Sequence, residues 1–134
     1  MEEFVALSPS LEDYLEAIYN LEQMEGTAVR LTDVAQHLSV SKASVNRAIG
    51  SLKQSGLVLH EHYGTLSLTP NGKMQAKDIY RRHIVLRSFL IDILGVDPAL
   101  AEKEACLMEH SLSMSTIDKW VIFLEKMSGK SRIQ

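Results

Sequence analysis

The sequence predicts a mainly α-helical protein with one small β-hairpin, and three observations carry this prediction. Six segments of the 134-residue chain place apolar residues at the three- and four-residue spacing of an amphipathic helix. Only residues 57–69 alternate apolar and polar side chains in the manner of a hairpin. Helix-start signals and glycine stops separate these segments, without an internal repeat or a long linker.

The composition is typical of a soluble globular protein. Hydrophobic residues make up 46% of the chain and charged residues 23%, and no run reaches the roughly 18 to 20 apolar residues of a membrane span. The acidic start Met-Glu-Glu-Phe is unlike a secretory signal, and the single cysteine, Cys106, cannot form an internal disulfide. We therefore expect a cytoplasmic protein with no membrane partner.

Charge is distributed unevenly along the chain. Residues 30–87 hold nine lysines and arginines against three acids, a net charge of +6, whereas the remainder carries −9. A basic middle between acidic ends predicts one surface for a polyanion and another where carboxylates gather around cations.

The first helix is expected to start at Ser10, which lies three residues before Asp13 in capping-box spacing, and to end near Gly26. Its apolar stripe consists of Leu11, Tyr14, Leu15, Ile18 and Leu21. The stripe predicts that this helix packs on a core along one face.

Two helices joined by a tight turn are expected next. The first runs from Thr32 to about Leu38, and Ser41 caps a second helix that Gly56 terminates. This is the helix-turn-helix arrangement. Residues 57–62 and 65–69 then form the predicted hairpin around Tyr63-Gly64, which would be a wing.

The polar side of the second helix indicates binding of double-stranded DNA. Ser41 and Ser44 can bond phosphates, while Asn46 and Arg47 lie where side chains reach base edges in the major groove. The alternative is an ordinary solvated helix face. The residues expected to contact DNA are Thr32, Ser41, Lys42, Ala43, Ser44, Asn46, Arg47, Lys53, Tyr63 and Gly64.

Three further helices complete the prediction. Thr69-Pro70 opens a long helix that stops at Gly95, and Asp97-Pro98 opens another that runs to about His110. Ser113 or Ser115 starts the last helix, and residues 128–134 form a frayed tail. The expected buried stripe of the last helix is Ile117, Trp120, Val121, Leu124 and Met127.

Possible metal ligands occur on three of these helices. Asp13 and Glu16 share one side of the first helix, and His83 lies on the long helix. Cys106, Glu109 and His110 fall at i, i+3 and i+4, again on one face. Nitrogen, oxygen and sulfur donors suit a divalent first-row transition metal.

Each group of candidate ligands also has an ordinary structural explanation: a solvated helix N-terminus, a core histidine or a small buried cysteine. The Cys-x-x-Glu-His grouping is the most specific, because three such side chains are costly to bury together without a cation.

Five stretches of the chain together resemble one known family. They are SLEDYLEAIY at 10–19, SVSKASV at 39–45, LTPNG at 68–72, Arg82-His83, and EACLMEHSLS at 104–113. They resemble the diphtheria-toxin-repressor family of metal-dependent transcriptional repressors, and the short length is similar to its manganese-transport-regulator subgroup. The resemblance implies a winged helix-turn-helix DNA-binding domain over residues 1–72. It also implies a helical metal-binding and dimerisation domain over residues 73–134, and hence a homodimer on operator DNA.

The resemblance further implies the ligand set. Asp13, Cys106, Glu109 and His110 match one metal site, and Glu16 and His83 match ligands of the neighbouring site in manganese-type members. The implied metal is Mn(II) or Fe(II), with Zn(II) or other divalent ions able to bind in vitro. Pairing Cys106 with Asp13 mixes the iron-type and manganese-type patterns.

One further departure concerns an ancillary site of iron-type members. Two of its ligand positions hold Arg87 and Glu102 in this chain, and we expect these two residues to pair with each other.

The expected function is metal-dependent repression of genes for metal uptake and homeostasis, without enzymatic activity and without a small organic substrate. One alternative is a winged-helix regulator that responds to a non-metal or redox signal through Cys106. A metalloenzyme is the other, but the chain has no glycine-rich cofactor loop or nucleophile motif, and an enzyme would leave the basic helix unexplained.

Overall fold

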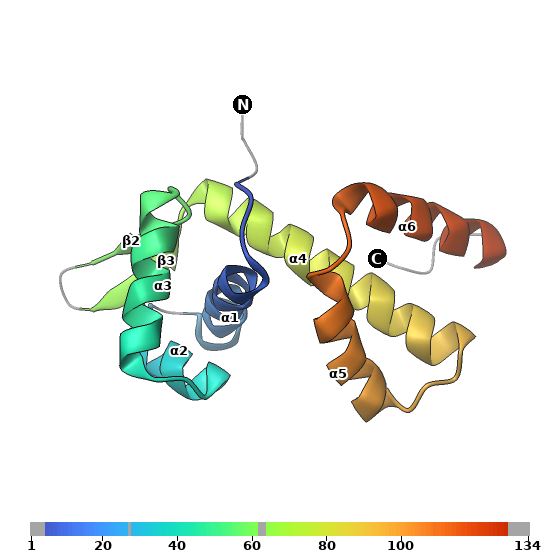
Figure 1. Cartoon of the computed structure of the whole chain (residues 1–134), viewed down its shortest axis with the longest axis horizontal. Coiled ribbons are helices and arrows are strands. Elements are labelled where there is room, and N and C mark those ends of the chain that lie inside the picture. The colour runs from blue at the N-terminus through green and yellow to red at the C-terminus, as the bar shows by residue number, and fades with distance from the viewer. Residues whose placement is uncertain (1–4, 27, 62–63, 129–134) are drawn as a thin grey trace. The chain divides into compact units, whose positions relative to one another are not determined.

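The computed structural model describes residues 5–26, 28–61 and 64–128, and the chain forms two compact units, Met1–Asp78 and Ile79–Gln134. The chain passes from one unit to the other within helix α4 (Pro70–Ser88). Among the described residues, no helix combines the length and the apolar composition needed to cross a membrane. Figure 1 shows the order of the elements.

Helix α1 (Pro9–Glu25) begins two residues earlier than predicted. Ser8, not Ser10, is the N-cap, and its hydroxyl accepts a hydrogen bond from the Leu11 N–H at 3.2 Å. Pro9 follows at the first helical position, where its fixed φ suits the helix and its missing N–H costs nothing. Gly26 ends the helix with a φ of 66°, as predicted.

The predicted helix-turn-helix is confirmed. Helix α2 (Leu31–Leu38) ends at Ser39, which adopts a left-handed φ of 56°, and α3 (Lys42–Gln54) begins after the N-cap Ser41. At the start of α2, the Asp33 carboxylate accepts the Arg30 N–H at 2.9 Å. This side-chain cap sets the start of α2 one residue before the predicted Thr32.

The hairpin is present, but it belongs to a three-stranded antiparallel sheet. Strands β2 (Val58–His60) and β3 (Thr65–Leu68) form the expected pair, and β1 (Val29–Arg30) adds to the other edge of β3. Strand β1 was not predicted, because a two-residue strand is too short to show alternation. In the predicted turn, Gly64 has a φ of 78°, and Tyr63 lies outside the described residues.

The core of the first unit joins its helices to the sheet. Fully buried members of this core include Leu15, Ile18, Val29, Val34, Val45, Ile49, Leu52, Leu57 and Leu66. In Figure 1, α1, α2 and α3 lie on one side of the small sheet. The first turn of α4 packs closely against Leu57 of the same unit. A Cβ at Gly72 would lie 2.0 Å from the Leu57 carbonyl oxygen. Only glycine permits this approach.

The start signals of the later helices are confirmed. The Thr69 hydroxyl accepts the Gly72 N–H at 2.9 Å before α4, and Asp97 accepts the Ala99 N–H at 3.1 Å before α5 (Pro98–Glu109). Ser113, rather than Ser115, caps α6 (Met114–Ser128) by accepting the Thr116 N–H at 3.2 Å.

The long helix ends differently from the prediction. It reaches Gly95, but its last stretch is the π-helical segment η1 (Phe89–Ile93) rather than a continuous α-helix. The periodicity of apolar residues does not reveal such a local widening of the helix.

The second unit has its own hydrophobic core. Its buried members are Val85, Leu86, Leu90, Ala101, Ala105, Ile117, Val121 and Leu124. The Phe89 and Trp120 rings meet edge to face at its border, with centroids 5.1 Å apart. Met127 was predicted to be buried but is 55% exposed, so the buried stripe of α6 ends at Leu124. The predicted tail at 129–134 lies outside the described residues.

Candidate metal centre and nucleic-acid interface

Helix α3 has one buried face and one exposed face. The buried face consists of Val45, Ala48, Ile49 and Leu52. The exposed face carries Lys42, Asn46, Arg47 and Lys53. Because the buried face packs in the core, the exposed face of α3 is accessible to a ligand.

Hydroxyl groups gather at the N-terminus of α3. The Ser41 hydroxyl accepts the Ser44 N–H at 3.1 Å, and the two hydroxyl oxygens lie 3.0 Å apart. Arg47 contacts the Ser44 hydroxyl at 3.5 Å from one turn further along. A helix N-terminus carries partial positive charge and N–H groups without intrahelical partners, so this end of α3 suits a phosphate group.

The other predicted DNA contacts are distributed over neighbouring elements. Thr32 in α2 and Ala43 in α3 are exposed, and Gly64, the residue before β3, is partly buried. The structure thus presents the predicted residues of α3 on one accessible face, while Tyr63 lies outside the described residues.

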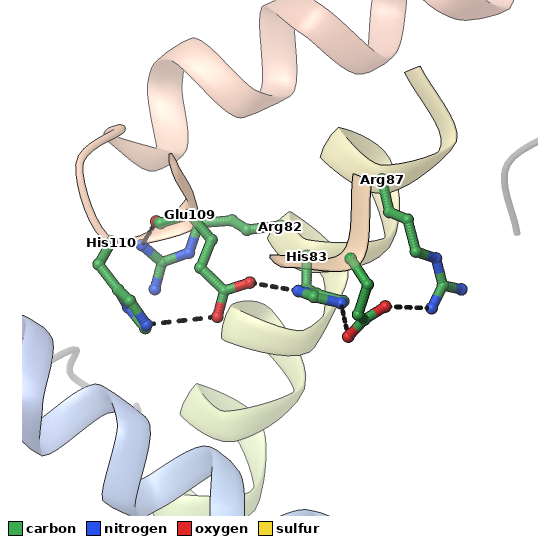
Figure 2. Close-up of polar contacts among 6 residues, drawn as sticks. Arg82, His83, Arg87, Glu109 and His110 are labelled. Atoms are coloured by element: carbon green, nitrogen blue, oxygen red, sulfur yellow. Dashed lines mark hydrogen bonds and ion pairs between the residues drawn. The ribbon is translucent and has the colours of Figure 1, made fainter. Parts of the chain in front are cut away.

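Four predicted metal ligands lie in the second unit, on α4 and on the C-terminal half of α5. The ring of His83 is the centre of the group: its Nδ1 lies 2.7 Å from Glu109 Oε1 and its Nε2 lies 2.8 Å from Glu102 Oε2. His110, the C-cap of α5, places its Nε2 3.5 Å from Glu109 Oε2. Figure 2 shows His110, Glu109 and His83 in one chain of contacts.

These contacts change the protonation of the histidine. The pKa of His83 rises from 6.5 to about 10, first through a hydrogen bond with Cys106 and then through the hydrogen bond and negative charge of Glu109. Burial of the ring acts in the opposite direction. In the metal-free protein at neutral pH, His83 is therefore a cation that donates to carboxylates on both edges.

A buried carboxylate oxygen in this group lacks a hydrogen bond. Glu109 is 0% exposed, and its Oε2 makes no hydrogen bond among the described residues, with the His110 Nε2 at an ion-pair distance of 3.5 Å. Burying such an oxygen is unfavourable unless a cation or donor compensates it. Two imidazoles, a thiol and a carboxylate form a donor set that suits a divalent first-row metal. The residues present therefore fit the predicted metal.

Cys106 is exposed on the same face of α5. Ligand atoms of His83, Glu102 and Cys106 all lie within 4.8 Å of one another. The thiol is thus close to the histidine while remaining accessible from solvent.

The other two predicted ligands belong to the first unit. Asp13 and Glu16 lie three residues apart in the N-terminal half of α1, so their carboxylates project from one side of that helix. Asp13 is exposed.

A buried arginine holds the end of α5 against α4. Arg82 is 7% exposed, and its Nη1 donates to the Glu109 carbonyl oxygen at 2.9 Å. A cation at the C-terminal end of a helix is electrostatically favourable, because the last carbonyl groups carry partial negative charge. This contact fixes the backbone between two predicted ligands, Glu109 and His110 (Figure 2).

The expected pairing of Arg87 with Glu102 is confirmed, at 3.0 Å between Arg87 Nη1 and Glu102 Oε1. Although partial burial raises the pKa of Glu102, hydrogen bonds with Arg87 and His83 lower it to below its ordinary value. Two contacts were not predicted from the sequence: that of Glu102 with His83 and that of Arg82 with the end of α5. Helical spacing could have identified Glu102, because it lies four residues before Cys106 and seven before Glu109 on the same face of α5.

Family models match both units of the chain. The N-terminal DNA-binding domain of the iron-dependent repressors matches residues 6–66, and their metal-binding and dimerisation domain matches residues 69–131. These two models together cover most of the chain.

Individual proteins give the same answer. The chain is 39% identical over 112 residues to the HTH-type transcriptional regulator MntR of Listeria monocytogenes. The aligned residues make up 84% of this chain and 78% of the relative. An HTH-type regulator of Methanocaldococcus jannaschii is 35% identical over 124 residues, which is 92% of this chain and 99% of the relative. Both are transcriptional regulators by name.

Among solved structures, the manganese regulator SloR superposes with a TM-score of 0.76 at 28% identity over 89% of this chain. This chain spans about half of that structure, 55% of its length. The resemblance found in the sequence is thus confirmed by sequence and by fold. The chain belongs to the diphtheria-toxin-repressor family of metal-dependent, iron-type and manganese-type transcriptional repressors, and its relatives place it with the manganese regulators.

Proposed function

We propose that this protein represses genes for metal uptake by binding operator DNA as a homodimer when it is loaded with Mn(II) or Fe(II). One observation carries the proposal beyond family membership. The buried Glu109 carboxylate, with one oxygen lacking a hydrogen bond, lies between His83 and His110. A divalent cation supplies the positive charge that this oxygen needs.

The proposed ligands in the second unit are His83, Cys106, Glu109 and His110. We propose that Asp13 and Glu16 of α1 add carboxylates to the same centre, as the family resemblance implies. Carboxylate and imidazole ligands suit manganese, whereas a thiolate favours iron or zinc. Zn(II) is expected to bind in vitro, because the affinity order places it above both physiological candidates.

DNA binding is assigned to α3 and its surroundings. Phosphate contacts would come from the N-terminus of α3 with Ser41 and Ser44, and base contacts from Asn46 and Arg47. Because dimers read half-sites spaced by whole helical turns, the second copy is part of the function. A repressor acts where the DNA is, so we place the protein in the cytoplasm.

Exposed apolar side chains of the second unit support the homodimer. They include Leu94, Leu107, Ile122 and Phe123, each more than half exposed. Leu90, in contrast, is buried in the core of its own unit and is not available to a partner. Large exposed apolar side chains in a dimerisation domain are suited to form the dimer interface.

The test is a titration of the metal-free protein with Mn(II), Fe(II) and Zn(II) under anaerobic conditions, following its binding to the DNA upstream of its own gene. Metal should raise DNA affinity at least tenfold, a coupling of about 1.4 kcal/mol. The same coupling must appear as tighter metal binding in the presence of DNA. Equal DNA binding with a chelator present would refute the metal switch.

Asp13→Ala tests the contribution of α1. We expect loss of the metal response with the dimer intact, whereas Asp92→Ala, which removes an exposed carboxylate from η1, should leave the response unchanged. An unchanged response in Asp13→Ala would remove this residue from the metal centre. Sedimentation shows in each case whether the dimer persists.

The redox alternative is tested by Cys106→Ser. A regulator that senses oxidants through this exposed thiol loses its response to peroxide, whereas a metal-regulated repressor changes its metal affinity or preference. Family membership favours the second outcome.

A further inference from the structure

The two nitrogens of His83 face two carboxylates that differ in their surroundings. Nδ1 faces Glu109, and Nε2 faces Glu102. The nitrogens lie on opposite sides of the imidazole ring, so a single metal ion can bind only one of them. The surroundings of the two carboxylates decide which.

The Nδ1 side has the properties of a metal site. Glu109 has no exposed surface, and its Oε2 lacks a hydrogen bond from the described residues while His110 lies 3.5 Å away. A second possible ligand and a buried carboxylate with one oxygen that makes no hydrogen bond thus occur together on this edge of the ring.

The Nε2 side lacks these properties. The Glu102 side chain is 52% exposed, and its second oxygen is already bound by Arg87 at 3.0 Å. Both carboxylate oxygens therefore have partners, and a guanidinium cation lies where it would repel a metal ion. Figure 2 shows Arg87 at the end of this chain of contacts, on the other side of His83 from Glu109.

We propose that Glu102 is a positioning residue: it accepts the Nε2 proton of His83 and so leaves Nδ1 as the nitrogen that binds the metal, with Arg87 holding Glu102 in place. The inference rests on the proposed function, because it requires His83 to be a ligand. A carboxylate that accepts the second N–H of a metal-bound histidine fixes both the tautomer and the orientation of the ring.

The competing assignment makes Glu102 a ligand itself. Its oxygen, a His83 nitrogen and the Cys106 sulfur lie within 4.8 Å of one another, so these three residues could hold an ion. Arg87 argues against this, because the ion would have to displace it from Glu102. The two assignments differ in the number of bound metals and in the nitrogen that is bound.

The experiment compares Glu102→Met, which removes the acceptor, with Glu102→Gln, whose amide oxygen can still accept the Nε2 proton. Glu104→Gln is the matched control, since it removes an exposed charge two residues away on α5. Metal affinity and stoichiometry are measured by competition with a chelator, using Mn(II) and Zn(II). In the diamagnetic Zn(II) form, long-range ¹H–¹⁵N spectra show which nitrogen of His83 carries the proton.

We expect Zn(II)-loaded wild type to show protonated Nε2 and metal-bound Nδ1. Glu102→Met should bind metal about 10- to 100-fold more weakly at unchanged stoichiometry, the usual effect of removing such an outer partner. Glu102→Gln should recover most of this loss and keep the tautomer, and Glu104→Gln should match wild type. If Glu102 acted only in folding, its substitution would not change which nitrogen of His83 carries the proton. The metal affinity of Glu102→Gln would then not exceed that of Glu102→Met.

Three results would overturn the inference: metal on Nε2 in wild type, loss of one metal per chain in Glu102→Met, or equal weakening by Met and Gln. If Glu102→Met does not fold, the spectrum of wild type and the affinity of Arg87→Met, which we expect to fall several-fold, still test it. Failure of the proposed function gives a different pattern, since wild type would then bind no metal or bind it without any effect on DNA affinity.

Discussion

Metal binding should be strongly dependent on pH, because the candidate ligand His83 is protonated in the metal-free protein. The pKa of this histidine is raised from 6.5 to about 10 by its contacts with Cys106 and Glu109. A metal can bind the ring only after one proton leaves it. Apparent affinity should therefore increase with pH until the pH reaches about 10, whereas affinity for a site with an unperturbed histidine levels off just above neutrality.

The magnitude follows from the size of the shift. Removing a proton at pH 7 from a group with a pKa of about 10 costs about 4 kcal/mol, since one pKa unit corresponds to roughly 1.4 kcal/mol. Apparent affinity at pH 7 should then be about a thousandfold below its limit and should rise about tenfold per pH unit for one displaced proton. An unperturbed histidine contributes almost no slope above about pH 7.5.

Cys106 must be separated from His83 in this measurement, because thiols also bind metals as deprotonated thiolates. The assay is chelator competition with Zn(II) or Mn(II) between about pH 7.5 and 8.5, applied to wild type and to Cys106→Ser. The serine variant retains a hydroxyl beside His83 and should show a slope of about one proton, whereas wild type should show a larger slope. A slope near zero in Cys106→Ser would show that His83 loses no proton on metal binding and would contradict this prediction.

Three further predictions concern other parts of the chain. Gly72→Ala should lower the free energy of unfolding in urea by about 2 to 4 kcal/mol, because the added Cβ would lie 2.0 Å from the Leu57 carbonyl oxygen and the backbone must move; a change below about 0.5 kcal/mol would contradict this packing. Arg47→Ala should weaken binding to operator DNA by about 1 to 3 kcal/mol even at saturating metal, as measured by fluorescence anisotropy, and unaltered affinity would remove α3 from the base contacts. Arg82→Met should weaken metal binding in a chelator competition, because it frees the end of α5 at Glu109 that the guanidinium holds at 2.9 Å; wild-type affinity would show that this contact does not position the ligands.

The helices could be predicted from the sequence because their signals are local. Asp97-Pro98 and Ser41 start α5 and α3 as expected, and Gly26 and Gly95 end helical segments with positive φ. Such signals depend on neighbours within one helical turn. Errors arose where two local signals competed, as at α1, where the Ser8 cap followed by Pro9 displaced the start predicted at the later serine.

Features that depend on distant contacts were not predictable in the same way. Strand β1 exists because Val29 and Arg30 pair with β3, 35 or more residues further along the chain. The π-helical turn at Phe89–Ile93 and the exposure of Met127 likewise depend on how the core of the second unit is packed. No periodicity in the sequence records these long-range contacts.

The candidate site shows the same division. The available ligand types could be read from the sequence, since the spacing of Cys106, Glu109 and His110 puts them on one face of any helix. The approach of Glu109 and Glu102 to opposite nitrogens of His83 depends on how α4 and α5 pack. The same packing pairs Glu102 with Arg87 and leaves one Glu109 oxygen without a hydrogen bond. The physical reason is that burial and charge pairing between α4 and α5 depend on distances across the fold, whereas helical spacing depends only on positions along the chain.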